Sequence, residues 1–138
     1  MKYEKSCGAV VFTRENEEIR YVIIRSLEGY YGFPKGHVEG SGKEEETALR
    51  EICEETGLKP RLLDGFRTTE EHPIPKKPGV IKQVVYFLAE YEDQEIVFQK
   101  EELLTAALMT FEEAMNAFQF ENNKRILAEA DEYLRTLR

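Results

Sequence analysis

Three glutamates in the middle of the chain are spaced so that an α-helix would bring their carboxylates together. Glu51, Glu54 and Glu55 occupy positions i, i+3 and i+4 of a stretch that runs from Gly36 to Leu58. A helix turns by about 100° per residue, so these side chains share one stripe of its surface. Crowded carboxylates repel one another unless a positive charge lies among them. The spacing therefore predicts a helix with an acidic stripe that binds a cation.

A hard divalent cation is the natural partner of such a stripe, because Mg²⁺ in proteins takes oxygen ligands from a few carboxylates and from substrate phosphates. The opposite side of the same helix carries smaller or apolar residues: Leu49, Ile52, Cys53 and Thr56. The helix is expected to begin near Lys43 and to end at Gly57, since glycine accepts the left-handed conformation that commonly terminates helices. Pro60 lies just beyond this predicted end.

This stretch resembles the Nudix box, the motif of the Nudix hydrolases. The motif reads Gly, five residues, Glu, seven residues, and then Arg-Glu-aliphatic-x-Glu-Glu-x-Gly-aliphatic. The positions that match at the correct spacing are Gly36, Arg50, Glu51, Ile52, Glu54, Glu55, Gly57 and Leu58. A run of charges more often marks an ordinary solvated helix. That alternative does not explain the glycines at both ends of the stretch.

One position departs from the motif, because Gly42 stands where the family carries its first glutamate. We hypothesise that Glu44 supplies the missing carboxylate, since it precedes Glu51 by seven residues and would share its helix face. The alternative is that nothing replaces it and that activity is merely reduced. The substitution Glu44→Gln distinguishes the two, because a drop in turnover of about tenfold or more would favour the hypothesis.

The resemblance implies an α/β protein with the Nudix fold, in which a mixed β-sheet is sandwiched between α-helices, and a single hydrolase domain over residues 1–138. It also implies Mg²⁺-dependent hydrolysis, with Mn²⁺ as a substitute, of a phosphoanhydride bond in a nucleoside diphosphate linked to another moiety. The residues that it assigns to the metal are Gly36 (through its carbonyl), Glu51, Glu54, Glu55 and Glu102. Its catalytic group is Glu51, as base or further ligand, with Glu54 and the orienting Arg50.

Outside the box, the chain resembles one branch of the family, the asymmetric diadenosine tetraphosphate hydrolases. The blocks that carry this similarity are residues 7–12, 33–39 and 82–90. The branch implies that diadenosine tetraphosphate is split into AMP and ATP. It assigns phosphate contacts to Lys35, His37 and Lys82, and a stacking contact with adenine to Tyr86.

Some of these assignments have an alternative. Tyr86 alternates within an apolar strand, so a place in the core is the competing interpretation. Glu101 stands beside Glu102, and only one of the two is expected to point inward. Where the branch usually carries an aromatic residue, this chain has Glu-Glu-His-Pro at residues 70–73.

Other nucleotide functions therefore stay open. The basic cluster of Lys76, Lys77 and Lys82 would serve long polyphosphates or RNA alike, so the alternative enzyme is a (d)NTP or RNA 5′-end pyrophosphohydrolase. A non-catalytic Nudix-like nucleotide sensor is the alternative of another class, and the glycine at position 42 motivates it. The intact set of Glu51, Glu54 and Glu55 argues against the sensor.

The composition excludes several classes of protein. A formal net charge of −8 argues against DNA binding, although metal ions can supply local positive charge for an anionic substrate. No apolar run approaches the ~18 residues of a membrane span, and residues 1–5 begin no signal peptide. We therefore expect a cytoplasmic protein with no membrane partner that acts on a small-molecule nucleotide. Cys7 and Cys53 are expected to be small buried hydrophobes. No oligomeric state is predicted.

Apolar periodicity predicts the remaining elements. Strands are expected at residues 7–13, 20–25, 61–69, 82–91 and 106–109, the first two buried on both faces. Helices are expected at residues 111–117 and 121–137. Residues 73–79 contain Pro73, Pro75 and Pro78, so they are expected to form an exposed connection, because proline cannot donate to a sheet ladder.

Overall fold

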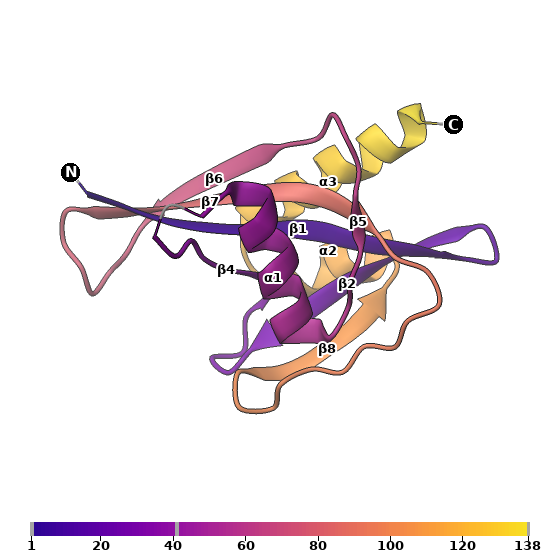
Figure 1. The fold of residues 1–138 in the computed structure, drawn as a ribbon, viewed down its shortest axis with the longest axis horizontal. Helices are drawn as coiled ribbons and strands as arrows, with labels where there is room; N and C mark the ends of the chain where they lie inside the picture. The colour runs from indigo at the N-terminus through magenta and orange to yellow at the C-terminus, as the bar shows by residue number, and fades with distance from the viewer. Residues whose placement is uncertain (1, 41, 138) are drawn as a thin grey trace.

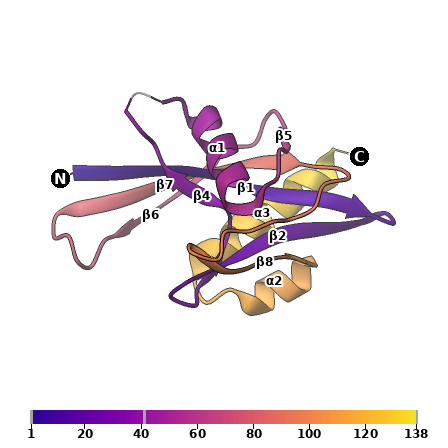
Figure 2. The same ribbon diagram turned by 60° about the horizontal axis from the view of Figure 1, so that its bottom comes forward.

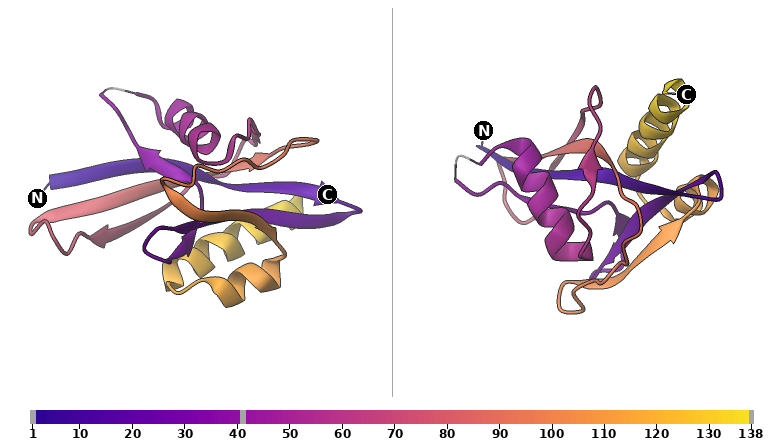
Figure 3. Two further views of the ribbon diagram at one scale, coloured as in Figure 1. Left: turned by 90° about the horizontal axis from the view of Figure 1, so that it is seen from below. Right: turned by 45° about the vertical axis from the view of Figure 1, so that its right-hand side comes forward.

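The computed structural model describes residues 2–40 and 42–137, and its sheet lies between helices on both faces (Figure 1, Figure 2). The sheet has eight strands in this part of the chain: β1 (Lys2–Glu15), β2 (Glu18–Ser26), β3 (Tyr31–Gly32), β4 (Lys35–His37), β5 (Arg61–Leu62), β6 (Thr68–Pro73), β7 (Val80–Glu90) and β8 (Leu103–Met109). The helices there are α1 (Glu44–Thr56), α2 (Phe111–Ala117) and α3 (Glu121–Thr136). Helix α1 covers one face, whereas α2 and α3 cover the other (Figure 3). The predicted α/β fold is confirmed.

Strand β1 lies at the centre of the sheet because its apolar run allows burial along most of its length. Residues 6–13 are all buried, which confirms the strand predicted at residues 7–13 and its burial on both faces. The strand pairs in parallel with β7 along one edge, and antiparallel with β4 and then β2 along the other. A strand that is paired on both edges and covered on both faces needs such a near-continuous apolar sequence.

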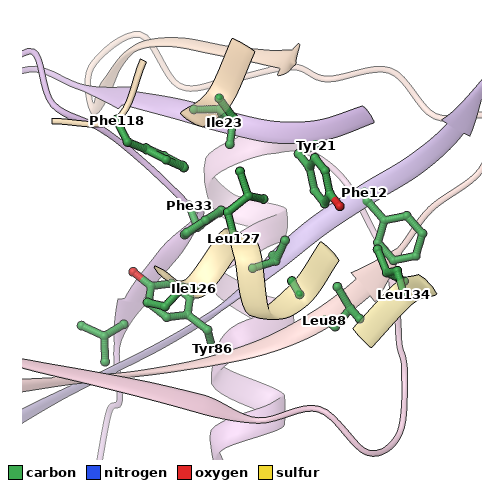
Figure 4. Packing of buried hydrophobic residues seen from close by; sticks show 14 residues of the cluster. Phe12, Tyr21, Ile23, Phe33, Tyr86, Leu88, Phe118, Ile126, Leu127 and Leu134 are labelled. Carbon is green, nitrogen blue, oxygen red and sulfur yellow. The ribbon is translucent and has the colours of Figure 1, made fainter. Parts of the chain in front are cut away.

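Alternate residues of the sheet point into two separate apolar cores, because successive side chains of a strand leave opposite faces. Val10, Phe12 and Tyr86 belong to the core beneath α3, and Figure 4 shows Tyr86 near Ile126 and Phe12 near Leu134. The core beneath α1 includes Cys7, Ala9, Val11, Ala48, Ile52, Leu58 and Val85. The two cores hold the helices at fixed positions on opposite faces of the sheet.

Helix α1 begins after Lys43 and ends at Gly57, as the sequence predicts. Gly57 has a φ of 75°, and its N–H donates a 2.8 Å hydrogen bond to the carbonyl of Cys53. This left-handed residue terminates the helix at the position where glycine is favoured. Ala48 and Ile52 are fully buried against the sheet, and the neighbouring Glu51 and Glu55 are partly buried, whereas Glu54 is exposed.

The predicted strand at residues 61–69 is divided in two, which corrects the sequence-based expectation. Gly65 has a φ of 90°, and the hydroxyl of Tyr133 donates a 2.7 Å hydrogen bond to the carbonyl of Asp64. This turn separates β5 from β6. Pro73 also differs from the expectation, because it ends β6 opposite Ile81 instead of opening the connection. Proline lacks a backbone N–H, and this loss is tolerated at the end of a strand.

The other predicted elements correspond to β2, β7, β8, α2 and α3, with ends that differ by up to three residues. Cys7 is buried as expected, whereas Cys53 is only half-buried, and both thiols are free. Across residues 2–40 and 42–137, no helix combines the length and the apolar character that a bilayer span requires.

Candidate active site

The carboxylate of Glu51 lies directly over Gly36, where α1 packs on strand β4. Gly36 is opposite Cys7 in the pairing of β4 with β1, so its backbone is fixed by the sheet. A Cβ atom at position 36 would overlap the carboxyl end of Glu51. The glycine is therefore required by the close approach of this glutamate. Glu51 in turn is largely enclosed, with 15% of its side chain exposed.

Arg50 connects this glutamate to its neighbours. Its Nη1 donates a 2.7 Å hydrogen bond to Oε2 of Glu51 and lies 3.3 Å from Oε1 of Glu54, which is one turn further along the helix. Its Nη2 donates at 3.1 Å to the carbonyl of His37 in β4. The guanidinium thus orients two carboxylates and ties α1 to β4. Its catalytic role stays a prediction.

Glu55 is the most enclosed of the three box carboxylates. Its Oε1 accepts a 3.0 Å hydrogen bond from the backbone N–H of Lys35. Burial raises the pKa of Glu55 to about 7, against the opposing effects of that hydrogen bond and of the Lys35 ammonium. Burial also raises the pKa of Glu51, and the charge of Glu54 adds to this effect. The positive charge near these two carboxylates therefore does not offset the cost of burying their negative charge.

Glu102 reaches the same cluster from the segment before β8. Glu54, Gln99, Glu101 and Glu102 line a shallow depression of about 250 Å³. Both glutamates of the pair therefore border it, but the negative charge of Glu102 contributes to the raised pKa values of Glu51 and Glu55. Of the two, Glu102 is therefore the one whose charge acts on the box carboxylates.

These residues fit a hard divalent cation by their chemistry. All the donors are oxygens, two of the carboxylates are partly desolvated, and Gly36 leaves the backbone accessible beside Glu51. Within the described residues, no three acidic, histidine or cysteine side chains converge closely enough to enclose an ion. Arg50 instead occupies the space between Glu51 and Glu54. A cation that bound to these two carboxylates would therefore have to displace the Arg50 guanidinium from them.

A group of basic side chains, with the Glu4 carboxylate among them, adjoins the acidic cluster through Lys35. Lys35, His37 and Lys82 come from β4 and β7, and they lie within electrostatic reach of one another. Burial lowers the pKa of Lys82, and the nearby Lys35 ammonium lowers it further. Burial likewise lowers the pKa of His37, with the Lys82 charge as the next cause. The structure therefore brings together the three residues predicted to contact phosphates, and Lys35 joins them to Glu55.

Tyr86 does not lie among these groups as an exposed ring. It is 1% exposed, and its ring meets Phe33 edge-on with centroids 5.4 Å apart (Figure 4). Burial raises its pKa strongly. The competing interpretation, a place in the core, describes this packing. The predicted stacking of Tyr86 on an adenine is not supported by it.

Two aromatic residues that the sequence analysis did not select form an exposed pair where the segment before β3 meets the start of α3. Tyr30 and Phe120 are 47% and 48% exposed as whole residues, and the centroids of their rings lie 5.0 Å apart. The side chain of Gln119 holds the two segments together, because it accepts from the N–H of Tyr31 and donates to the carbonyl of Gly29. The sequence signal that could have indicated this pair is an aromatic residue between polar residues at the start of a helix, Gln-Phe-Glu at residues 119–121.

Comparison with known proteins finds relatives along almost the whole chain. The sequence pattern of the NUDIX domain matches residues 2–130. The asymmetrical bis(5′-nucleosyl)-tetraphosphatase of Rattus norvegicus is 32% identical over 142 residues, which cover 94% of this chain and 95% of that protein. An Ap4A hydrolase of C. elegans, solved as a binary complex, has a TM-score of 0.88 at 19% identity over 96% of this chain and 98% of that one. The E. coli dihydroneopterin triphosphate pyrophosphohydrolase has a TM-score of 0.75 at 19% identity over 94% and 97%.

The carboxylate of Glu44 binds Arg67 and Lys5, whereas the sequence analysis expects it to join the metal-binding carboxylates. Arg67 donates two 2.9 Å hydrogen bonds to its carboxylate, and Lys5 forms an ion pair with it. The Arg67 guanidinium is the main cause that lowers the pKa of Glu44 to about 2. The carboxylate is thus engaged at the first turn of α1. The hypothesis that it replaces the glutamate missing at Gly42 is not supported by this geometry.

We predict that Glu44→Gln weakens folding without weakening catalysis. The folded pKa of about 2 lies below the unstructured value of 4.5, so this charge stabilises the fold above pH 4.5 and its contribution disappears as the pH falls toward 2. Because Arg67 is half exposed, the loss in unfolding free energy at pH 7 should be only about 0.5–1 kcal/mol. Denaturation followed by circular dichroism at pH 7, 4 and 2 measures it.

Glu45→Gln is the matched control, because Glu45 is an exposed glutamate in the same helical turn. It should leave both the unfolding free energy and turnover unchanged. A drop in turnover of about tenfold for Glu44→Gln would instead restore a direct role for this carboxylate in the active site.

Proposed function

This chain belongs to the Nudix hydrolase family, and on that premise we propose that it hydrolyses dinucleoside polyphosphates, with diadenosine tetraphosphate split into AMP and ATP. The observation that carries the proposal is that Lys35, whose N–H binds the box carboxylate of Glu55, lies near Lys82 and His37. The tetraphosphatases among the relatives support the same substrate class. The fold by itself does not, because it is shared by enzymes that act on other nucleotides.

A long polyphosphate suits this charge distribution. The chain has a net charge of −8, so an anionic substrate needs a local site of opposite sign. Lys35 occupies the junction of the two clusters, because its N–H binds Glu55 and its ammonium lies near Lys82. Phosphates bound here would extend from the acidic cluster toward His37. The metal end and the basic end would then neutralise successive phosphates.

Glu51, Glu54, Glu55 and Glu102, with the carbonyl of Gly36, would hold the divalent cation, for which we propose Mg²⁺. When bound, this ion supplies electrophilic activation of the phosphate and lowers the pKa of an attacking water. Glu51 would accept the proton of that water, because its carboxylate is held over Gly36 next to the other proposed metal ligands. The new bond joins the water oxygen to the phosphorus of the AMP moiety, and ATP leaves with the oxygen of the broken anhydride.

The exposed pair of Tyr30 and Phe120 offers a surface for one nucleobase. Phe118, two residues before Phe120, packs on Phe33, with ring centroids 5.2 Å apart. Phe33 precedes Lys35 by two residues, so the pair is joined through short segments to the basic cluster. Stacking on exposed aromatic rings recognises a base by its flat face and tolerates different bases.

A product analysis with purified protein and Mg²⁺ tests the proposal. Diadenosine tetraphosphate, ATP, dGTP, an ADP-sugar and a 5′-triphosphorylated RNA are compared by kcat/KM, with products separated by anion exchange. We expect AMP and ATP in equal amounts from the dinucleotide, with much slower turnover of the others. Faster turnover of a triphosphate, the sugar nucleotide or RNA would reject the substrate class. Binding of the dinucleotide without turnover would favour a nucleotide sensor.

Phe120→Ala should weaken substrate binding more than chemistry. Base–aromatic stacking contributes ~1–3 kcal/mol per base, so we expect KM for diadenosine tetraphosphate to rise about tenfold while kcat changes little. Tyr3→Ala is the control, because Tyr3 is an aromatic residue of β1 with 59% exposure. If KM is the same for Phe120→Ala and the wild type, the aromatic pair is not a base-binding surface.

A further inference from the structure

Residues 92–102, here called the strap, connect β7 to β8 and carry Glu102 to the active site. The strap passes beside the C-terminal end of α1 (Figure 3). It contains no helix or strand, so its own backbone does not hold it in place. Glu102 is the last residue of the strap, and its N–H and that of Leu103 both bind the carbonyl of Gln99. Leu103 pairs with Ser26 of β2, so the position of this glutamate depends on β8 as well as on where the strap is attached.

Three contacts attach the strap to the end of α1 and to the chain that follows. The side-chain amide of Gln94 accepts from the N–H of Lys59 at 2.8 Å and donates to the carbonyl of the same residue at 3.2 Å. The N–H of Val97 donates at 2.8 Å to the carbonyl of Thr56, which the helix end would otherwise leave without a partner. Ile96 packs against the apolar core beneath α1.

These attachments depend mainly on polar groups. The side chain of Val97 is exposed, since the residue is 64% accessible, so the strap is not held there by apolar burial. Gly57 lies against it closely enough that an added Cβ would be 3.3 Å from the carbonyl oxygen of Val97. The glycine that ends the box thus has two functions, because its φ of 75° ends the helix and its missing side chain admits the strap.

We propose that Gln94 is a positioning residue for the active site, because its paired hydrogen bonds to Lys59 fix the strap so that Glu102 faces Glu54. The two ends of the carboxylate cluster lie on different segments, one on α1 and the other on the strap. Gln94 joins the strap to the segment that directly follows α1, and thereby sets their spacing. The inference rests on the metal role proposed for Glu54 and Glu102, and not on the identity of the nucleotide.

Mn²⁺ binding to the protein alone tests this inference. Free Mn²⁺ is measured by electron paramagnetic resonance in a titration without nucleotide, so a wrong substrate assignment cannot affect the result. Groups that hydrogen-bond a metal ligand directly contribute about 10–100-fold to metal affinity, whereas Gln94 acts on Glu102 only through the strap. We therefore expect Gln94→Ala to raise the Mn²⁺ dissociation constant by about threefold, below that range. Glu95→Gln, an exposed residue of the same strap, should leave it unchanged.

A double-mutant cycle separates positioning from a general loss of structure. If Gln94 acts through Glu102, Gln94→Ala should have no further effect on Mn²⁺ affinity in a Glu102→Ala background. Hydrogen exchange of the Glu102 N–H should accelerate in Gln94→Ala without metal, while exchange in β1 stays slow. Gln94→Glu keeps the acceptor for Lys59 and loses the donor, so it should give an intermediate result if Gln94→Ala does not fold.

Two results would overturn the inference. Wild-type Mn²⁺ affinity in Gln94→Ala would show that the strap does not need this attachment. An equal loss of affinity in the wild-type and Glu102→Ala backgrounds would show that Gln94 acts by another route. A wild-type protein that binds no Mn²⁺ would reject the metal role and the inference together, whatever the product analysis yields.

Discussion

The contact between the carboxyl end of Glu51 and the bare backbone of Gly36 determines how this site is built. It exists because α1 packs on the sheet through Ala48 and Ile52, while β4 is held beneath it by pairing with β1. Any side chain at position 36 would displace the glutamate. The apolar core thus sets the distance between α1 and the sheet, and the glycine allows Glu51 to reach the backbone of β4. The chemistry depends on this packing.

Charge is arranged around that contact in two adjoining clusters of opposite sign. Arg50 lies between Glu51 and Glu54, and the N–H of Lys35 binds Glu55, so each box carboxylate has a partner without a metal. Partial burial nevertheless raises the pKa values of Glu51 and Glu55, which shows that these partners do not fully compensate the charge. A cation would relieve this imbalance. On the other side of Lys35, the Lys82 ammonium supplies positive charge, whereas the lowered pKa of His37 favours its neutral imidazole.

The parts of the structure that were predictable from sequence are those set by local spacing. The bounds of α1 follow from Lys43, Gly57 and the stripe between them, and β1 follows from its apolar run. The division between β5 and β6 was not predicted, because the turn at Asp64 and Gly65 is held by a hydrogen bond from Tyr133, which is distant in the sequence. Alternation along β7 could not show whether Tyr86 faces a ligand or the core. The strand is buried on both faces, so neither side is marked by polar residues around position 86. Tyr30 and Phe120 meet only through tertiary packing.

Turnover and binding by Glu51→Gln test the central claim, that a carboxylate held over Gly36 is the base of a hydrolase. The substitution preserves the size of the side chain and removes its charge. Loss of a general base typically lowers the rate by about 10²–10⁴-fold. We expect a fall of that size in the turnover of diadenosine tetraphosphate, with its binding, followed by calorimetry with Mg²⁺, little changed. Turnover close to that of the wild type would contradict the account.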